Sequence, residues 1–224
     1  SVGGMAPNKR QFGNLLGDVD HLPHTHSLEH NAFSRGQPKW GSHLADDLES
    51  LAELHGAHNI AAVIVEPMAA STGVLIPPVG YLERLRKICS DLGILLIFDE
   101  VITGFGRLGA SFACERFDVI PDILTCAKGL TNATVPMGGV VVRKDIYDTL
   151  ITNSEQPIEL FHGYTYSGHP LACAAGLATL DLYLSEKLFK RASELESYWE
   201  EGVWHPPLLV FAIQMMLMLV LGHV

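Results

Sequence analysis

Residues 94–100 read ILLIFDE, a run of five apolar residues that ends in two carboxylates, Asp99 and Glu100. A short, unbroken apolar run of this kind is typical of a strand that is buried on both faces of a sheet. The segment before it, Pro78–Leu92, predicts a helix, because proline stands at its start and Gly93 follows its end. The stretch therefore predicts one helix–strand unit of an α/β sheet whose strand ends in acidic side chains.

Strands and helices continue to alternate on both sides of this unit. Short apolar runs predict further strands, and segments with apolar residues at three- and four-residue steps predict further helices. The strands are expected at 60–65, 122–126 and 138–142, and the helices at 42–55, 144–150 and from 170 to about 199, with a break near Ser185. Ser42 is the expected N-cap of the helix that starts there. The pattern predicts an α/β fold with a mostly parallel sheet and helices on both faces.

The two ends of the chain lack this pattern. The first 40 residues are rich in Gly, Pro, His and Asn and predict loops. The chain reads as if it begins inside a longer protein, so residues 1–203 are expected to form part of one large domain. Residues 204–224 predict an atypical apolar tail, which is shorter than the roughly 20 apolar residues that a membrane span needs.

The composition excludes several classes of protein. The chain carries 15 Lys and Arg against 25 Asp and Glu, and a net charge of −10 would repel the phosphates of a nucleic acid. A hydrophobic content of 48% excludes a disordered chain. The four cysteines form no C-x-x-C pair, which favours free thiols in a reducing compartment such as the cytoplasm. Neither a nucleic acid nor a membrane is expected as a partner.

Ionisable side chains follow two of the predicted strands. Ligands of parallel α/β sheets bind beyond the carboxyl ends of the strands, where Asp99 and Lys128 stand. Taken singly, Asp99 reads as a helix-capping carboxylate and Lys128 as a solvated loop lysine. Together they suggest a pyridoxal-phosphate site, in which a lysine binds the aldehyde and a carboxylate keeps the ring nitrogen protonated. Partial burial between Ala127 and Gly129 would disfavour the charged amine and make it nucleophilic.

Several longer motifs surround these two residues. Glu66-Pro67, residues 98–107 (FDEVITGFGR) and Ala127-Lys-Gly129 resemble, in order and separation, the signature of the class III pyridoxal-phosphate aminotransferases. Within that family, HLPHTH (21–26), NAFSRGQPKWG (31–41), LTNATVPMG (130–138) and HGYTYSGHP (162–170) are similar to the omega-amino acid–pyruvate (β-alanine–pyruvate) transaminases. The resemblance covers about residues 1–201. It implies the type I aspartate-aminotransferase fold, of which this chain is part of the large cofactor-binding domain, and ping-pong transamination with pyruvate.

The resemblance also implies roles for five residues. Lys128 would bind pyridoxal 5'-phosphate covalently and move the proton, and Asp99 would pair with the pyridinium nitrogen. Val101 would press on the face of the ring, although core packing alone would also explain it. Thr165 would donate to the phosphate of the cofactor in a neighbouring subunit of a homodimer or tetramer; its alternative role is a local loop hydroxyl. Glu66 would lie near the substrates, an amino donor and pyruvate.

Two further motifs point to other ligands. Residues 104–109 match the G-x-G-x-x-G spacing of a dinucleotide-binding loop, but the segment that follows is too short for the helix such a loop requires. Four histidines within residues 21–30 are spaced like metal ligands, yet Pro23 interrupts any helix and no cysteine lies nearby. We therefore expect neither a dinucleotide nor a metal.

Two other functions stay open on the sequence alone. An uncovered sheet edge and the apolar tail would suit a truncated, catalytically silent chain that only self-associates. The family also contains pyridoxal-phosphate aminomutases and decarboxylases, which keep the cofactor and change the reaction.

Overall fold

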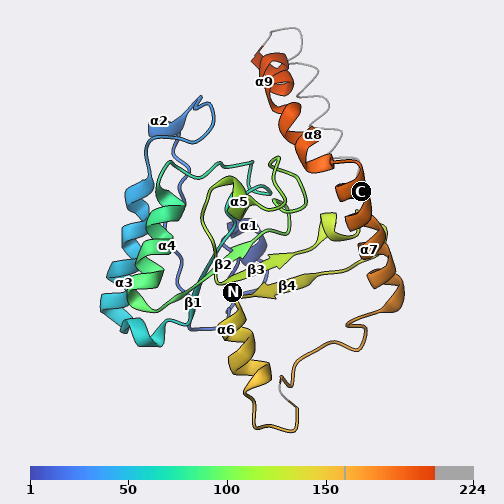
Figure 1. Ribbon diagram of the computed structural model, residues 1–224. Coiled ribbons are helices and arrows are strands. Elements are labelled where there is room, and N and C mark those ends of the chain that lie inside the picture. The colour runs from blue at the N-terminus through green and yellow to red at the C-terminus, as the bar shows by residue number, and fades with distance from the viewer. Residues whose placement is uncertain (159, 205–224) are drawn as a thin grey trace.

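A computed structural model describes residues 1–158 and 160–204 of the chain (Figure 1). A four-stranded sheet lies at its centre, in the spatial order β1-β2-β3-β4. β1, β2 and β3 run parallel, and β4 is antiparallel to β3. All four predicted strands are therefore present, at Ala62–Val65 (β1), Leu95–Asp99 (β2), Ile123–Cys126 (β3) and Gly139–Val142 (β4).

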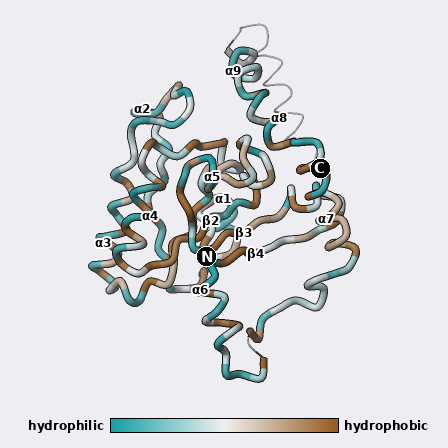
Figure 2. The backbone as a smooth tube through the Cα atoms, in the orientation of Figure 1, coloured by the Kyte–Doolittle hydropathy of each residue, from teal (hydrophilic) through white to brown (hydrophobic). Residues whose placement is uncertain are grey.

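The hydrophobic core lies against one face of this sheet. Leu96 and Phe98 of β2 are fully buried, and they pack in one cluster with Leu85 and Cys89 of helix α4 (Tyr81–Leu92) and Leu48 of α3 (Asp47–His55). Figure 2 shows the hydrophobic residues concentrated along the strands. Since side chains alternate between the faces of a strand, the residues between these core positions point to the opposite face.

The opposite face of the sheet is less completely covered. Ile64 of β1 is 42% exposed and Val140 of β4 is 65% exposed. Asp99 belongs to this face, because it alternates with Phe98 and pairs with Thr125 of β3. The mixed sheet with helices agrees with the predicted α/β fold, and its partly open face carries the acidic end of β2.

The N-terminal ends of two predicted helices differ from expectation. Residues Ser42–Asp46 form a 3-10 helix ahead of α3, and Gly41, not Ser42, is its N-cap, so the predicted capping role of Ser42 is wrong. Gly41 has φ 121°, and a Cβ there would lie 2.8 Å from Cγ of Pro78, so neither conformation nor space admits a side chain. α4 begins at Tyr81 after left-handed Gly80, and it ends at Gly93 as predicted.

The remaining helices follow the predicted order. The break near Ser185 is confirmed, because α7 ends there and Lys187 takes a left-handed conformation (φ 53°) before α8 begins. A helix begins at Lys144 as predicted and continues as a π-helical turn, Asp148–Thr152. The bounds are α1 Ala6–Lys9, α2 Leu28–Asn31, α5 Ala113–Arg116, α6 Lys144–Tyr147, α7 Pro170–Ser185, α8 Leu188–Glu194 and α9 Glu196–Trp204, with short 3-10 helices at Ala57–Asn59 and Lys128–Leu130.

The predicted apolar tail lies, apart from Trp204 at the end of α9, outside the described residues. Within residues 1–158 and 160–204, no helix combines the length and the apolar character needed to cross a bilayer.

Candidate active site

The carboxyl ends of β2 and β3 meet at one edge of the sheet and carry the predicted pair of functional residues. Asp99, the last residue of β2, pairs in register with Thr125 of β3. Its Oδ1 accepts hydrogen bonds from the backbone N–H of Val101 at 3.1 Å and from the hydroxyl of Thr125 at 3.4 Å. No donor within the described chain reaches Oδ2 of Asp99. One carboxylate oxygen is thus fixed, while the other is available to a ligand.

The carboxylate that caps a helix here is the neighbouring Glu100. Its side chain is fully buried, and Oε1 accepts from the backbone N–H of Cys114 at 2.9 Å. Oε2 accepts from the backbone N–H of Ala113 and from the hydroxyl of Thr103. Glu100 therefore ties the start of α5 to the end of β2. The cap of α5 is thus Glu100, while Asp99 accepts the backbone N–H of Val101 within the turn after β2.

Lys128 lies two residues after the end of β3 and opens the 3-10 helix Lys128–Leu130. Its backbone is left-handed (φ 43°), an uncommon conformation for a residue with a side chain. The prediction of partial burial is wrong, because Lys128 is exposed. Ala127 and Gly129 carry too little side chain to cover its four-carbon stem. Among the described residues its amine has no hydrogen-bond or ion-pair partner, so it is available for a ligand.

The residue next to Lys128 is held by two aromatic side chains. A Cβ at Gly129 would lie 2.8 Å from Cβ of Phe105, in the loop between β2 and α5. The carbonyl of Gly129 accepts a 2.8 Å hydrogen bond from the hydroxyl of Tyr183 on α7. The rings of Phe105 and Tyr183 stack at 6.0 Å between centroids and 19° between planes. Three segments that are distant in sequence therefore meet beside Lys128.

The other predicted site residues are Val101, Glu66 and Thr165. Val101 is partly buried and contacts Asp99 through its own N–H. Glu66 comes directly after β1, the neighbour of β2, and its Oε2 accepts from the backbone N–H of Ala70 at 3.2 Å. Glu66, Asp99 and Lys128 thus stand at or just after the carboxyl ends of the three successive parallel strands β1, β2 and β3.

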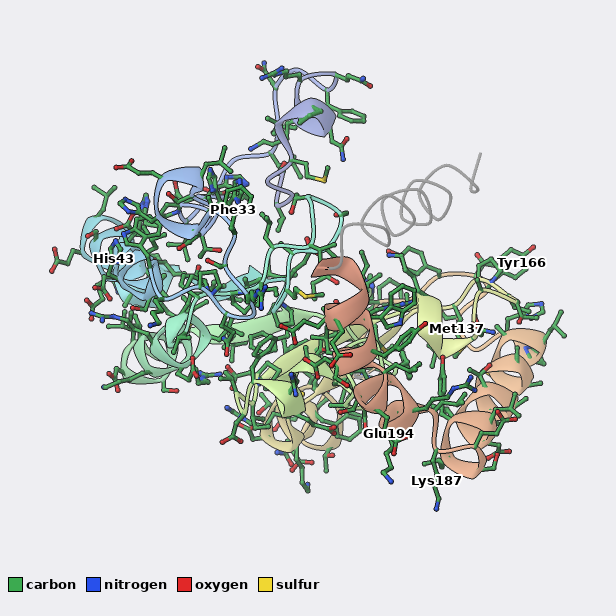
Figure 3. All side chains as sticks on the ribbon, turned by 90° about the horizontal axis from the view of Figure 1, so that it is seen from above. Phe33, His43, Met137, Tyr166, Lys187 and Glu194 are labelled. Atoms are coloured by element: carbon green, nitrogen blue, oxygen red, sulfur yellow. The ribbon has the colours of Figure 1, made fainter. Side chains whose placement is uncertain are left out.

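Thr165 is not brought to the pair within one chain. It is exposed in a turn that is closed by hydrogen bonds in both directions between Tyr164 and Ser167. Its neighbour Tyr166 lies at the outer margin of the molecule, at the opposite side from Phe33 and His43 (Figure 3). The predicted contact between Thr165 and the cofactor of a second subunit stays a prediction.

Sequence reasoning missed two residues of this site. Thr125 stands opposite Asp99 in the β2–β3 register, and the alternation of strand side chains was the signal that could have found it. Tyr183 is 54 positions from Gly129, and no local pattern links them.

The structure also bears on the two other motifs. The helix after the G-x-G-x-x-G segment, α5, is only 4 residues long and starts at Ala113, so the N-terminus that would hold a pyrophosphate is not placed at Gly109. In the part of the chain that the structure describes, no three His, Cys, Asp or Glu side chains are arranged to hold a metal ion. The ring of His30 instead stacks on Trp40 at 4.5 Å, and His43 meets Trp40 edge-on at 5.1 Å.

Comparison with known proteins adds the family. The sequence profile described as "Aminotransferase class-III" matches residues 1–204. The chain belongs to the class III aminotransferases. This class III chain is 64% identical to the omega-aminotransferase of Caulobacter vibrioides and 54% identical to the beta-alanine–pyruvate aminotransferase of Pseudomonas aeruginosa, in each case over 91% of this chain and 46% of the relative. It therefore spans about half the length of these curated relatives.

A solved structure agrees with the fold as well as the family. An amine transaminase from an uncultivated Pseudomonas species, in its PLP-bound (internal aldimine) form, is 43% identical, with a TM-score of 0.68 over 72% of this chain and 36% of its own. At this identity the similarity supports the fold and the family together. The predicted family and the type I fold are confirmed, whereas the roles of the individual site residues stay predictions.

Proposed function

We propose that this class III chain carries the cofactor-binding part of a pyridoxal-phosphate-dependent transaminase. The reaction moves an amino group from an omega-amino acid or amine, such as β-alanine, to pyruvate. Two features carry the proposal: the amine of Lys128 has no partner in the described chain, and the carboxylate of Asp99 has one oxygen that accepts no hydrogen bond there. Both stand at the ends of adjacent parallel strands, where α/β sheets bind ligands. The names of the two curated relatives support the choice of reaction.

The donors and acceptors of this edge suit pyridoxal phosphate. Bound there, the cofactor would supply an electron-accepting pyridinium ring. Asp99 would hold the proton of the ring nitrogen at Oδ2, while Val101 N–H and the Thr125 hydroxyl fix Oδ1. A carboxylate opposite a cationic nitrogen favours the protonated ring. Lys128 Nζ would bind the aldehyde carbon with loss of water; once the substrate amine had displaced it from that carbon, the freed amine would move a proton at the substrate carbon.

Three further parts of the proposal concern the surroundings of this pair. Val101 would pack on a face of the ring, next to the carboxylate that its N–H orients. Glu66 would lie on the substrate side, at the end of the neighbouring strand. Thr165 would donate to the phosphate in a second subunit of a homo-oligomer.

A reducing cytoplasm suits the four cysteines, all of which are free thiols in the structure.

The test compares Lys128→Ala with Lys187→Ala in the protein purified at its native length. Lys187 is a matched control, because it is also an exposed lysine with a left-handed backbone, and it stands outside the sheet, in the link between α7 and α8 (Figure 3). Pyridoxal phosphate is added, the adduct is reduced with borohydride, and the labelled peptide is identified by mass spectrometry. Formation of alanine from β-alanine and pyruvate is measured in parallel.

We expect label on Lys128 in the unchanged protein and in Lys187→Ala, and neither label nor alanine in Lys128→Ala. Label with no alanine, but with another amine product, would point to an aminomutase or decarboxylase. A protein that takes up no cofactor and only self-associates would be catalytically silent, and the proposal would be wrong.

A further inference from the structure

The backbone of Lys128 is in a strained conformation that its own sequence does not favour. Its φ of 43° lies in the left-handed region, where an L side chain crowds the neighbouring carbonyl. Such a conformation persists only where surrounding structure holds it, and it is concentrated at functional sites. Since Lys128 is exposed and its amine has no partner in the described chain, the side chain itself supplies no restraint. The restraint must act on the backbone.

Hydrogen bonds within the turn supply part of this restraint. The carbonyl of Lys128 accepts from the backbone N–H of Thr131 at 3.4 Å and of Ala133 at 3.2 Å. Both bonds are long and connect residues of the same short turn, so the turn alone can shift as a unit. A fixed position for Lys128 relative to Asp99 requires a contact with another element.

Tyr183 of α7 provides that contact. Its hydroxyl donates to the carbonyl of Gly129 at 2.8 Å and so connects the turn to α7. Burial raises the pKa of Tyr183, so its hydroxyl keeps the proton that it donates. The ring of Tyr183 is in turn fixed between those of Phe105, at 6.0 Å, and Phe189 of α8, at 5.1 Å.

Phe105 completes the clamp from the side of β2. It lies against Gly129 so closely that a Cβ there would be 2.8 Å from its own Cβ. Phe105 belongs to the loop that follows Asp99 and is anchored by buried Glu100, whose carbonyl accepts from the N–H of Gly104 at 3.0 Å. The contacts of Gly129 thus connect the Lys128 turn to the segment that carries the acid.

We propose that Tyr183 is a positioning residue for Lys128: through the Gly129 carbonyl it holds the strained lysine turn at the orientation in which the amine faces the cofactor aldehyde. This inference rests on the proposed function, because it assigns to Tyr183 a purpose in the binding of pyridoxal phosphate by Lys128. Tyr183 itself touches neither the cofactor nor the substrate. It acts on the reacting amine only through the backbone.

The test replaces Tyr183 by phenylalanine, which removes the hydroxyl and keeps the stacked ring. Tyr147→Phe is the matched control, since Tyr147 on α6 is half exposed and its hydroxyl has no partner in the described structure. Both variants and the unchanged protein are purified at native length. Hydrogen exchange of the amides at 129–133 is measured without cofactor, and the rate at which borohydride fixes pyridoxal phosphate on Lys128 is measured separately.

We expect Tyr183→Phe to speed amide exchange at 129–133 about fivefold, which corresponds to the loss of one ordinary hydrogen bond. The rate of label fixation on Lys128 should fall by a similar factor, and Tyr147→Phe should match the unchanged protein in both. Faster exchange with unchanged labelling would give Tyr183 a structural role alone and overturn the proposal, as would no change in either measurement. If the unchanged protein takes no label on Lys128, the proposed function fails, which distinguishes that outcome from the failure of this inference.

Discussion

Replacement of Glu100 by alanine removes the acceptor of three hydrogen bonds from the interior of the protein. The carboxylate is fully buried and receives the N–H groups of Ala113 and Cys114 and the hydroxyl of Thr103. The hydroxyl can rotate toward another acceptor, whereas the two N–H groups are fixed by the backbone of α5. In Glu100→Ala these two donors lose their acceptor, and the void is too enclosed for bulk water to replace it.

The size of the effect follows from the two orphaned donors. Each buried N–H without a partner costs about 1–3 kcal/mol, so the free energy of unfolding should fall by about 2–6 kcal/mol. Urea unfolding of the cofactor-free protein, followed by circular dichroism, measures this difference. Cofactor is left out because ligand binding would add its own stabilisation of the folded state.

Glu115→Ala is the control, taken from α5 itself. Its Oε2 also caps a backbone N–H, that of Ser111 at 3.1 Å, but the contact is exposed and water can replace the carboxylate. We expect a loss of about 1 kcal/mol or less. If Glu100→Ala costs no more than Glu115→Ala, burial does not govern the strength of this cap, and the assignment of Glu100 as the anchor of the loop after β2 is refuted.

Two further predictions concern packing and pH. Gly129→Ala should lower the free energy of unfolding by about 1–3 kcal/mol, because the new Cβ meets Phe105. Gly163→Ala is the control and should have no such effect, because no atom lies within 4 Å of a Cβ at that position. Equal unfolding midpoints for the two variants would contradict the close contact between Gly129 and Phe105. Burial raises the pKa of the Cys89 thiol from 9.0 to about 11, so the unfolded chain releases its proton first. The stabilising contribution is complete below pH 9 and is lost as the pH rises to about 11. Unfolding free energies over this range should fall less steeply in Cys89→Ala, and parallel curves would exclude the effect.

Local pattern was enough to predict the elements that position the site. The apolar run ending at Asp99 became β2, the run ending at Cys126 became β3, and Gly93 ends α4 in the left-handed conformation that glycine adopts without strain. These features depend on residues a few positions apart, and their side-chain periods and backbone preferences are visible in the sequence. The family signature around Asp99 and Lys128 was visible for the same reason.

The tertiary structure alone decided which group does what at this edge. Asp99 and Glu100 are adjacent carboxylates at the end of one apolar run, and only the packing of α5 over Glu100 makes that residue the buried cap, while one oxygen of Asp99 accepts no hydrogen bond in the described chain. The exposure of Lys128 and its connection to Tyr183 likewise depend on how α7 packs against the turn. Sequence periodicity reports which face of an element is apolar, but not which distant side chain will meet it, because such contacts are chosen by the packing of the whole chain.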